Sequence, residues 1–236
     1  MPTQPSSIPA DTPPAVENRC AAGDRDLVAT IRDAARACFA DARGSHDWDH
    51  TLRVHALCLR IGPKEGADIV VLEAAAYLHD IGRAAQDAAH GSVCHARQGA
   101  ERARSLLAPL ALDEARKVNI VHCVHAHRFR DGNAPATVEA RVLFDADKLD
   151  AIGAVGVARA YLFAGELGAR LHNPGLSPEA ARPYSRDDTG HREFVVKLRT
   201  IKDRMLTTEG RRLALERHAF MVSFFERFIR EYDGHC

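Results

Sequence analysis

The sequence predicts an all-α protein with one folded domain. From Asp24 onward the hydrophobic pattern has the helical period almost throughout, and runs that alternate apolar and polar residues, as strands do, are nearly absent. A chain of 236 residues can bury one substantial core. We therefore expect a helical bundle over residues 23–236. A tail over residues 1–22, rich in Pro, Ser, Thr and Ala, is expected to be disordered.

Glycine, proline and capping residues divide the bundle into helices. We expect helices over about residues 24–43, 46–62, 67–81, 94–108, 113–128, 137–153, 154–171, 188–205 and 208–232. Gly44 and Gly82 end two of them, and the pair Gly62-Pro63 ends a third. Asp113 and Thr137 are expected to cap the helices that follow them, because their side chains accept amide protons that are otherwise unpaired.

The C-terminal part contains a long loop and an aromatic helix. Residues 173–188 carry three prolines and one glycine, and Ser177-Pro178 is typical of a short helical turn. Long ordered loops are often functional, so this loop is expected to be either a lid over the site or a surface excursion. The phenylalanines of the last helix recur at helical spacing and are expected to form a packing face.

Composition argues against several classes of protein. Lys+Arg and Asp+Glu both number 32, which disfavours a nucleic acid polymer as the main partner but leaves room for a local basic pocket. The six cysteines form no Cys-x-x-Cys pair and are expected to be reduced thiols. The N-terminus lacks the features of a secretory signal and no segment has the length of a membrane span, so a cytoplasmic location is expected.

Two histidine motifs lie in the N-terminal half. His46 and His50, four residues apart on a helix, would share a face as metal-binding histidine pairs do, although surface or core-edge histidines can have the same spacing. The pair His79-Asp80 closes a run that is too apolar for a surface helix. Burying these groups is costly unless they are paired, so metal ligation and a buried hydrogen bond are both open.

An acidic cluster follows farther along the chain. Asp147 and Asp150 lie on one helix face, whereas Asp145 lies about 140° round from Asp150. These carboxylates would repel one another unless a cation intervenes, and Lys148 is expected to point to a different side. For Asp145, helix capping is the alternative to metal binding.

Histidine also recurs between the two motif regions, at residues 95, 122, 125 and 127, and at most two of these four are expected to be functional. His127 stands at a helix end beside Arg128 and Arg130. A histidine with two arginines suits an oxyanion such as phosphate.

In order along the chain, these motifs resemble the HD-domain superfamily of metal-dependent phosphohydrolases. The motifs are His46-Asp-Trp-Asp-His50, Leu78-His-Asp-Ile-Gly82, His127-Arg-Phe-Arg130 and Asp145-Ala-Asp-Lys-Leu-Asp-Ala-Ile-Gly-Ala154. The resemblance covers about residues 24–232 and points to a bacterial-type subgroup of single-domain HD hydrolases. It implies a single-domain helical bundle of the HD type.

The resemblance implies four metal ligands, which are His50, His79, Asp80 and Asp147. His50 is preferred to His46 because it directly precedes the Thr-Leu-Arg-Val segment. Asp147 is preferred to Asp145 because the family ligand lies within Ala-Asp-x-Leu, and Asp145 stays an alternative.

Other roles are less specific. The resemblance implies that His95 and His127 hold either a second metal or the substrate phosphate. Certain nucleotidases of the superfamily carry a glutamate shortly after the His-Asp pair, but Ile81-Gly-Arg-Ala stands there in this chain, so that role is not carried over.

The implied activity is metal-assisted hydrolysis of a phosphorylated small molecule, expected to be a nucleotide or a related metabolite. The ligand set suits Mn²⁺, Fe²⁺, Co²⁺, Ni²⁺, Zn²⁺ or Mg²⁺, with one or two ions per chain. Asp80 is expected to accept a proton from water as well as to bind metal. Lys148 is expected to act with Asp80 as a catalytic residue by neutralising phosphate charge, and His127, Arg83, Arg128 and His46 are expected to contact the substrate.

The subgroup suggests, more specifically, that a nucleoside triphosphate is cleaved with release of pyrophosphate. The alternative is a catalytically weak HD-fold module that senses nucleotides, although the intact ligand set disfavours it. No membrane partner is expected, and assembly as a homodimer stays open.

Overall fold

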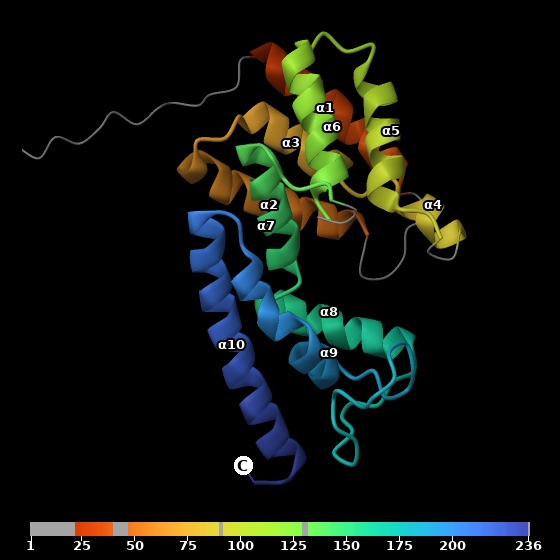
Figure 1. Cartoon of the computed structure of the whole chain (residues 1–236), viewed down its shortest axis with the longest axis vertical. Coiled ribbons are helices and arrows are strands. Elements are labelled where there is room, and N and C mark those ends of the chain that lie inside the picture. The colour runs from red at the N-terminus through yellow and green to blue at the C-terminus, as the bar shows by residue number, and fades with distance from the viewer. Residues whose placement is uncertain (1–21, 40–46, 90–91, 129–131, 236) are drawn as a thin grey trace, which may run out of the picture.

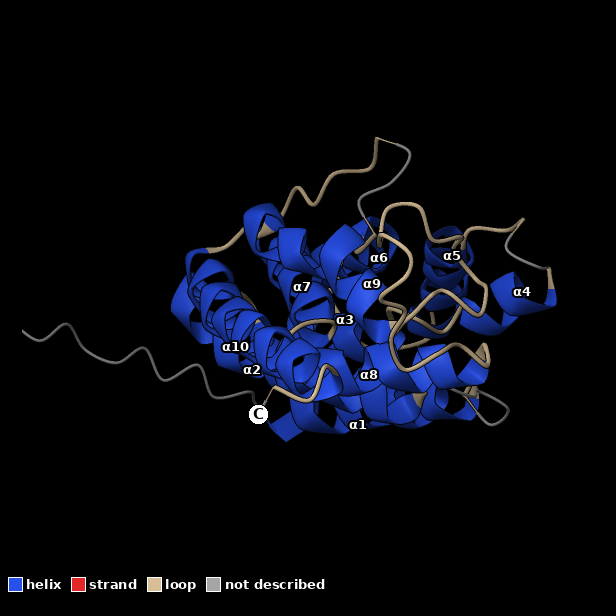
Figure 2. Cartoon of the chain, turned by 90° about the horizontal axis from the view of Figure 1, so that it is seen from below, coloured by secondary structure: helices blue, strands red, loops and turns tan. Residues whose placement is uncertain are grey.

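The computed structural model describes residues 22–39, 47–89, 92–128 and 132–235, and all regular secondary structure in these ranges is helical (Figure 2). The helices are α1 (Ala22–Ala37), α2 (Trp48–Glu65), α3 (Ile69–Leu78), α4 (Arg83–Ala88), α5 (His95–Leu107), α6 (Glu114–Ala126), α7 (Val138–Asp150), α8 (Gly153–Glu166), α9 (Gly190–Val196), the 3₁₀ helix η2 (Leu198–Arg204) and α10 (Thr208–Tyr232). The all-α prediction is confirmed for the described part of the chain. Within it, no helix combines the length and the apolar character of a membrane span.

Helix α3 forms the centre of the N-terminal part of the bundle. Eight of its ten residues are buried, as its apolar sequence requires. It packs against α1, α2, α6 and α7, while α8, α9 and α10 form the other end of the molecule (Figure 1). Helices α2 and α7 lie between the two ends and pack against each other.

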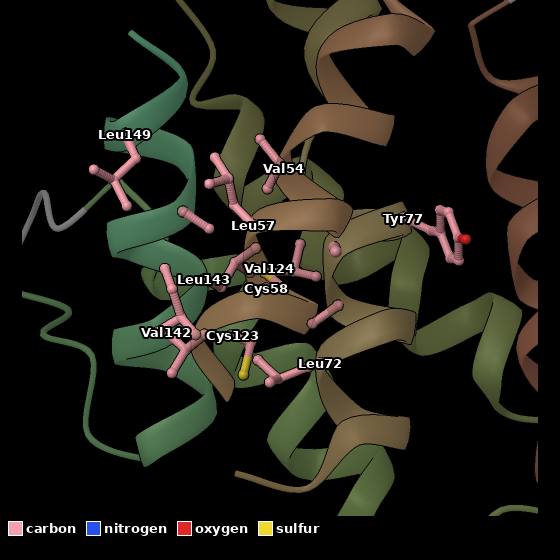
Figure 3. Packing of buried hydrophobic residues seen from close by; sticks show 14 of the residues in the cluster. Val54, Leu57, Cys58, Leu72, Tyr77, Cys123, Val124, Val142, Leu143 and Leu149 are labelled. Atoms are coloured by element: carbon pink, nitrogen blue, oxygen red, sulfur yellow. The ribbon is translucent and has the colours of Figure 1, made fainter. Parts of the chain in front are cut away.

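The core joins side chains from α2, α3, α6 and α7 (Figure 3). Its members include Val54, Leu57, Cys58, Leu72, Cys123, Val124, Val142, Leu143 and Leu149. Each large apolar side chain buried in this way contributes roughly 1.5–3 kcal/mol relative to an exposed one. The predicted phenylalanine face of α10 is confirmed at Phe225, which is buried and stacks on Phe194. Phe220, in contrast, is largely exposed.

Aspartate and threonine side chains begin the helices that carry the site. The predicted caps are confirmed, because Asp113 accepts from the amide of Arg116 and Thr137 from that of Ala140. Asp47 caps α2 by accepting from the amide of His50 at 3.0 Å, which places that histidine in the first turn.

Three predicted helix ends were wrong, the first being that of α1, which ends at Ala37 rather than at residue 43. Helix α2 continues through Pro63 to Glu65 and ends at Gly66, whose φ is 74°. A proline this close to the end removes only one backbone donor, and the left-handed glycine supplies the actual stop. Similarly, α8 ends at Glu166 rather than near residue 171, because Gly168 is left-handed and the amide of Ala169 bonds to Ala164 O.

The single helix expected over residues 188–205 is instead α9 followed by η2. The chain leaves helical geometry at Lys197, with φ −139° and ψ −57°. In the 3₁₀ geometry that follows, residues three apart face the same side, which buries both Leu198 and Ile201. Thr189 caps α9, so the helix begins at Gly190.

The loop over residues 173–188 forms turns but no helix, and it lies beside α8 and α9 (Figure 1). Together with His172, His191 and Asp233 it lines a cavity of about 500 Å³. This cavity contains none of the predicted site residues. Whether the loop acts as a lid stays a prediction. The predicted tail, apart from Ala22, and His46 lie outside the described residues.

Candidate metal centre

Six side chains with metal-ligating atoms meet where α2, α3, α5, α6 and α7 converge. The first cluster comprises His50, His79 and Asp147, and the second cluster comprises Asp80, His95 and His127. Within each cluster the candidate ligand atoms lie within 4.8 Å of one another. All of these residues are buried except Asp147, which is half-buried.

In the first cluster, the Nε2 atom of His50 is the common neighbour. It lies 3.3 Å from His79 Nε2 and 3.4 Å from Asp147 Oδ1. His50 comes from the first turn of α2, His79 follows the last residue of α3, and Asp147 belongs to the last turn of α7. The order of helices inferred from the sequence therefore does bring these three residues together.

Asp80 lies between the two clusters and turns one carboxylate oxygen toward each. Its Oδ2 atom is 3.9 Å from His50 Nε2 and 3.8 Å from His79 Nε2. Its Oδ1 atom is 3.1 Å from His95 Nε2 and 3.6 Å from His127 Nε2. A carboxylate placed in this way can bridge two ions, one in each cluster.

The two histidines that end helices are held by their own backbone. His79 Nδ1 lies 2.8 Å from Ala76 O, and His127 Nδ1 lies 2.7 Å from Val124 O. A carbonyl oxygen can only accept, so each Nδ1 must carry a proton, and in the neutral ring each Nε2 then presents a lone pair. Local helix geometry thus fixes the tautomer that metal binding requires.

Side chains hold the other two histidines. His50 Nδ1 lies 2.8 Å from Asp150 Oδ2, and His95 Nδ1 lies 2.8 Å from Gln86 Oε1. All four Nδ1 atoms therefore face an oxygen acceptor, and all four Nε2 atoms face the cluster interiors.

The second cluster contains lone pairs that face one another. His95 Nε2 lies 3.1 Å from His127 Nε2, and both approach Asp80 Oδ1. Burial lowers the pKa of His95 to about 4, with Asp80 opposing that shift, so this imidazole is neutral near pH 7. When both imidazoles are neutral, three buried acceptors face one another with no proton between them, which is unfavourable unless a cation lies at their centre. The donor set therefore fits a divalent metal ion.

The histidines of the first cluster have opposite pKa shifts. Burial lowers the pKa of His79 to about 4, although Asp80 opposes the shift. Burial also lowers the pKa of His50, but hydrogen bonds to Asp147 and Asp150 outweigh it and raise the pKa to about 9. In the metal-free protein His50 is thus the proton-carrying member of the cluster.

Asp147 and Asp150, near the end of α7, remain ionised despite burial. Burial favours the neutral form of Asp147, yet Lys148 and His50 hold its pKa well below the usual range. For Asp150, hydrogen bonds from His50 and Arg53 outweigh burial and lower the pKa to about 2. The prediction that Asp147 and Asp150 share a face is confirmed, because they contact opposite nitrogens of the His50 ring.

Cationic side chains border the clusters. Lys148 Nζ lies 2.6 Å from Asp147 Oδ2, so the expectation that Lys148 points away from the acidic cluster was wrong. Its Nζ atom also lies over the ring of Phe144, 4.9 Å from the centroid, so the flexible side chain turns back toward its own helix. An Arg83 guanidinium nitrogen lies 3.1 Å from Asp80 Oδ2. Arg128 donates to Gln86 Oε1 at 3.2 Å.

Asp145, the alternative to Asp147, belongs to neither cluster. Its carboxylate is fully buried and accepts from the amides of Leu206 and Thr207 and from the Thr207 hydroxyl. Burial raises the pKa of Asp145, while the hydrogen bonds from Thr207 and Leu206 lower it. The capping alternative was wrong, because Thr137 caps α7 and Asp145 instead holds Leu206 and Thr207, which directly precede α10.

Of the four central histidines, only His95 and His127 enter a cluster. His122 Nε2 accepts from the amide of Ala136, and His125 is exposed. Substrate contacts predicted for His46, and the oxyanion role of Arg130, fall outside the described residues.

The sequence did not reveal the residues that accept a hydrogen bond from the Nδ1 atoms of His50 and His95, which are Asp150 and Gln86. Asp150 was assigned to an acidic cluster, but its bonds to His50, Arg53 and Arg159 depend on the packing of α2 and α8 against α7. Gln86 could not be found because its short helix α4 was not predicted. Its alanine, arginine and glutamine residues favour a helix, but six residues are too few for a helical period to show in the sequence.

Comparison with known proteins agrees with this geometry. The HD domain family matches residues 47–152. The uncharacterized protein YpgQ of Bacillus subtilis is 33% identical over 209 residues, which cover 86% of this chain and 93% of that protein. The crystal structure of Bacillus subtilis YpgQ in complex with ADP is similar with a TM-score of 0.68 and 30% identity, covering 89% of this chain and 100% of that chain.

A second solved structure has the same fold. An HD-superfamily hydrolase from Bacillus thuringiensis matches with a TM-score of 0.71 and 26% identity, covering 89% of this chain and 98% of that chain. Together with the identity to YpgQ over most of both chains, these findings show that the protein belongs to the HD-domain superfamily.

Proposed function

We propose that the protein is a metal-dependent phosphohydrolase that cleaves a phosphoester or phosphoanhydride bond of a nucleotide or a related phosphorylated metabolite. The observation that carries this proposal is the position of Asp80, whose two oxygens face two histidine pairs with converging Nε2 atoms. The similar YpgQ structure contains ADP, which supports a nucleotide as the ligand.

We assign His50, His79, Asp80 and Asp147 to one ion, and His95, His127 and the other oxygen of Asp80 to a second. Two imidazoles and one or two carboxylates per ion suit first-row divalent metals. When bound, such ions supply Lewis-acid activation of water and of a phosphoryl oxygen. Because each Asp80 oxygen faces one cluster, metal binding is the main role that we give it, and proton acceptance by Asp80 stays a prediction.

The bordering cations would orient the phosphate groups. Lys148 and Arg83 now form ion pairs with Asp147 and Asp80, and both are half-buried. Ions bound to these carboxylates would compete for the same charge, leaving Lys148 and Arg83 available to substrate oxygens at the edge of the site. Arg128, beside His95, would extend this positive edge. Release of pyrophosphate from a nucleoside triphosphate is the specific reaction that we propose.

Metal analysis combined with a product screen tests this function. The purified protein would be assayed with Mn²⁺, Co²⁺, Ni²⁺, Zn²⁺ and Mg²⁺ over a panel of nucleotides, with orthophosphate and pyrophosphate measured separately. We expect metal-dependent turnover, with pyrophosphate and not orthophosphate as the product. Orthophosphate would place the cleaved bond elsewhere in the polyphosphate chain.

Paired variants separate the site from the fold. Asp80→Ala is expected to lose metal and turnover, and His127→Ala is expected to lose the ion of the second cluster together with turnover, while both retain the helical circular dichroism spectrum. His125→Ala is the matched control, because it removes an exposed histidine from the same helix. Unchanged hydrolysis by a metal-free Asp80→Ala protein would refute the proposal. Tight nucleotide binding without turnover under every metal would identify a sensing module instead.

A further inference from the structure

The two clusters differ in the group that holds their side-chain-bound histidine. In the first cluster a carboxylate, Asp150, accepts from His50 Nδ1 at 2.8 Å. In the second cluster a neutral amide, Gln86, accepts from His95 Nδ1 at the same distance. A carboxylate behind a histidine makes the imidazole a stronger ligand than an amide does, because its charge favours electron donation toward the metal.

The orientation of the Gln86 amide is fixed by its neighbours. The atom that faces His95 Nδ1 also lies 3.2 Å from a guanidinium nitrogen of Arg128. A guanidinium can only donate, so this atom must be the amide oxygen. His95 Nδ1 must then donate to it as well, which leaves the lone pair on Nε2. Gln86 thus positions His95 as Asp150 positions His50, but without a negative charge.

The charges of the ligands differ in the same direction. The first cluster has the carboxylate of Asp147 in addition to one oxygen of Asp80, whereas the second has only the other Asp80 oxygen. Arg128 also approaches His95 Nδ1 to 3.4 Å, which places a positive charge behind the second cluster. Two cations, Arg53 and Arg159, contact Asp150 behind the first cluster. The first cluster nevertheless has one more carboxylate ligand, Asp147, than the second.

We infer that the two clusters bind divalent ions with unequal affinity, the first tightly and the second weakly, and that Asp150 and Gln86 set this difference as positioning residues. This inference rests on the proposed function, because it takes both clusters to be metal sites. It goes further in that it assigns an order of filling and names the residues that determine it.

Titration of the metal-free protein with Mn²⁺ alone tests the order. Calorimetry is expected to resolve a tight and a weak binding step, and dialysis followed by elemental analysis gives the number of ions at each free Mn²⁺ concentration. His95→Ala is expected to remove only the weak step, which assigns that step to the second cluster.

The positioning roles are tested by changing charge while preserving shape. Gln86→Glu is expected to tighten the weak step by about 10- to 100-fold, the usual size of such outer-ligand effects, and to leave the tight step unchanged. Asp150→Asn is expected to weaken only the tight step by a similar factor. Gln98→Glu is the matched control: it adds the same charge one turn after His95, and in the described part of the chain its side chain makes no hydrogen bond to that histidine.

Asp150 also binds two arginines, so the result for Asp150→Asn is interpreted only if its circular dichroism spectrum is native. If it is not native, Gln86→Glu alone tests whether the charge behind the histidine sets the metal affinity. Two steps of equal affinity, or equal effects of Gln86→Glu and Gln98→Glu, would overturn the inference and leave the proposed function standing. Binding of a single ion would overturn it as well. No Mn²⁺ binding at all would overturn both.

Discussion

Asp145 and Asp147 are two residues apart, and replacing each by alanine is expected to affect a different property, the stability of the fold for Asp145 and metal binding for Asp147. Asp145→Ala should destabilise the fold and leave metal binding intact, because its carboxylate faces the start of α10. Asp147→Ala should abolish binding at the first cluster with a smaller loss of stability, because Asp147 is half-buried and its partner Lys148 can return to solvent.

The size of the stability loss follows from the contacts of Asp145. Its oxygens accept from Leu206 N at 2.9 Å, Thr207 N at 2.8 Å and Thr207 Oγ1 at 2.6 Å. The two backbone donors lie on Leu206 and on Thr207, the residue that caps α10. Each buried donor left unsatisfied costs about 1–3 kcal/mol. Since the Thr207 hydroxyl can rotate toward another acceptor, we expect a loss of about 2–5 kcal/mol, against a total of about 5–15 kcal/mol for a typical domain.

Urea denaturation of the metal-free proteins, followed by circular dichroism, measures this loss without a contribution from bound metal. The denaturant slope should be unchanged and the midpoint should fall. Mn²⁺ titration of the same variants gives the second readout. The reasoning is refuted if Asp147→Ala is destabilised as much as Asp145→Ala, or if Asp145→Ala loses more metal affinity than Asp147→Ala.

Four further predictions concern helix packing, the protonation of His50 and metal binding. Gly210→Ala should destabilise the protein by about 1–3 kcal/mol in urea, because a Cβ would lie 2.2 Å from Asp145 Oδ2; Gly165→Ala, whose Cβ would meet nothing within 4 Å, should instead stabilise it by about 0.5–1 kcal/mol. Metal binding at pH 7 should release about one proton from His50, whose pKa is raised to about 9, and calorimetry in buffers of different ionisation enthalpy should show this release disappearing above that pH. The raised pKa of His50 also stabilises the metal-free fold, fully below about pH 6.5, and this contribution should be lost as the pH rises through about 9. The free energy of unfolding of the metal-free protein would be measured over this range in the wild type and in His50→Gln. An increase in the wild type but not in His50→Gln would contradict the raised pKa of His50. Chelation should lower the melting temperature, and Mn²⁺ should restore it. At a hundredfold excess of Mn²⁺ over the dissociation constant, bound metal should add about 2.7 kcal/mol to the free energy of unfolding. Equal melting curves with and without metal would contradict binding to the folded state.

Local signals predicted the helices well where a cap or a breaker acts within a few residues. Asp113 and Thr137 cap their helices as expected, because capping joins a side chain to an amide three residues away. Pro63 misled the prediction of the α2 end, since the cost of a proline depends on where in the helix it falls. The break at Lys197 was missed because burial of Leu198 and Ile201, which favours the 3₁₀ form, is decided by tertiary packing.

The candidate site was predicted in part. The sequence determined an all-α chain of the HD type and the ligand residues that its motifs carry, because these depend on residue identity and short spacings. Only the tertiary structure decided that Asp80 is shared between two clusters, and that Asp145 holds the two residues before α10 rather than facing a metal. It also decided that Asp150 and Gln86 hold the histidines from behind. The physical reason is sequence separation: the His50–Asp150 bond joins residues 100 positions apart, and the Asp145–Leu206 bond spans 61. Such pairs form only when the helices pack, so no local pattern encodes them.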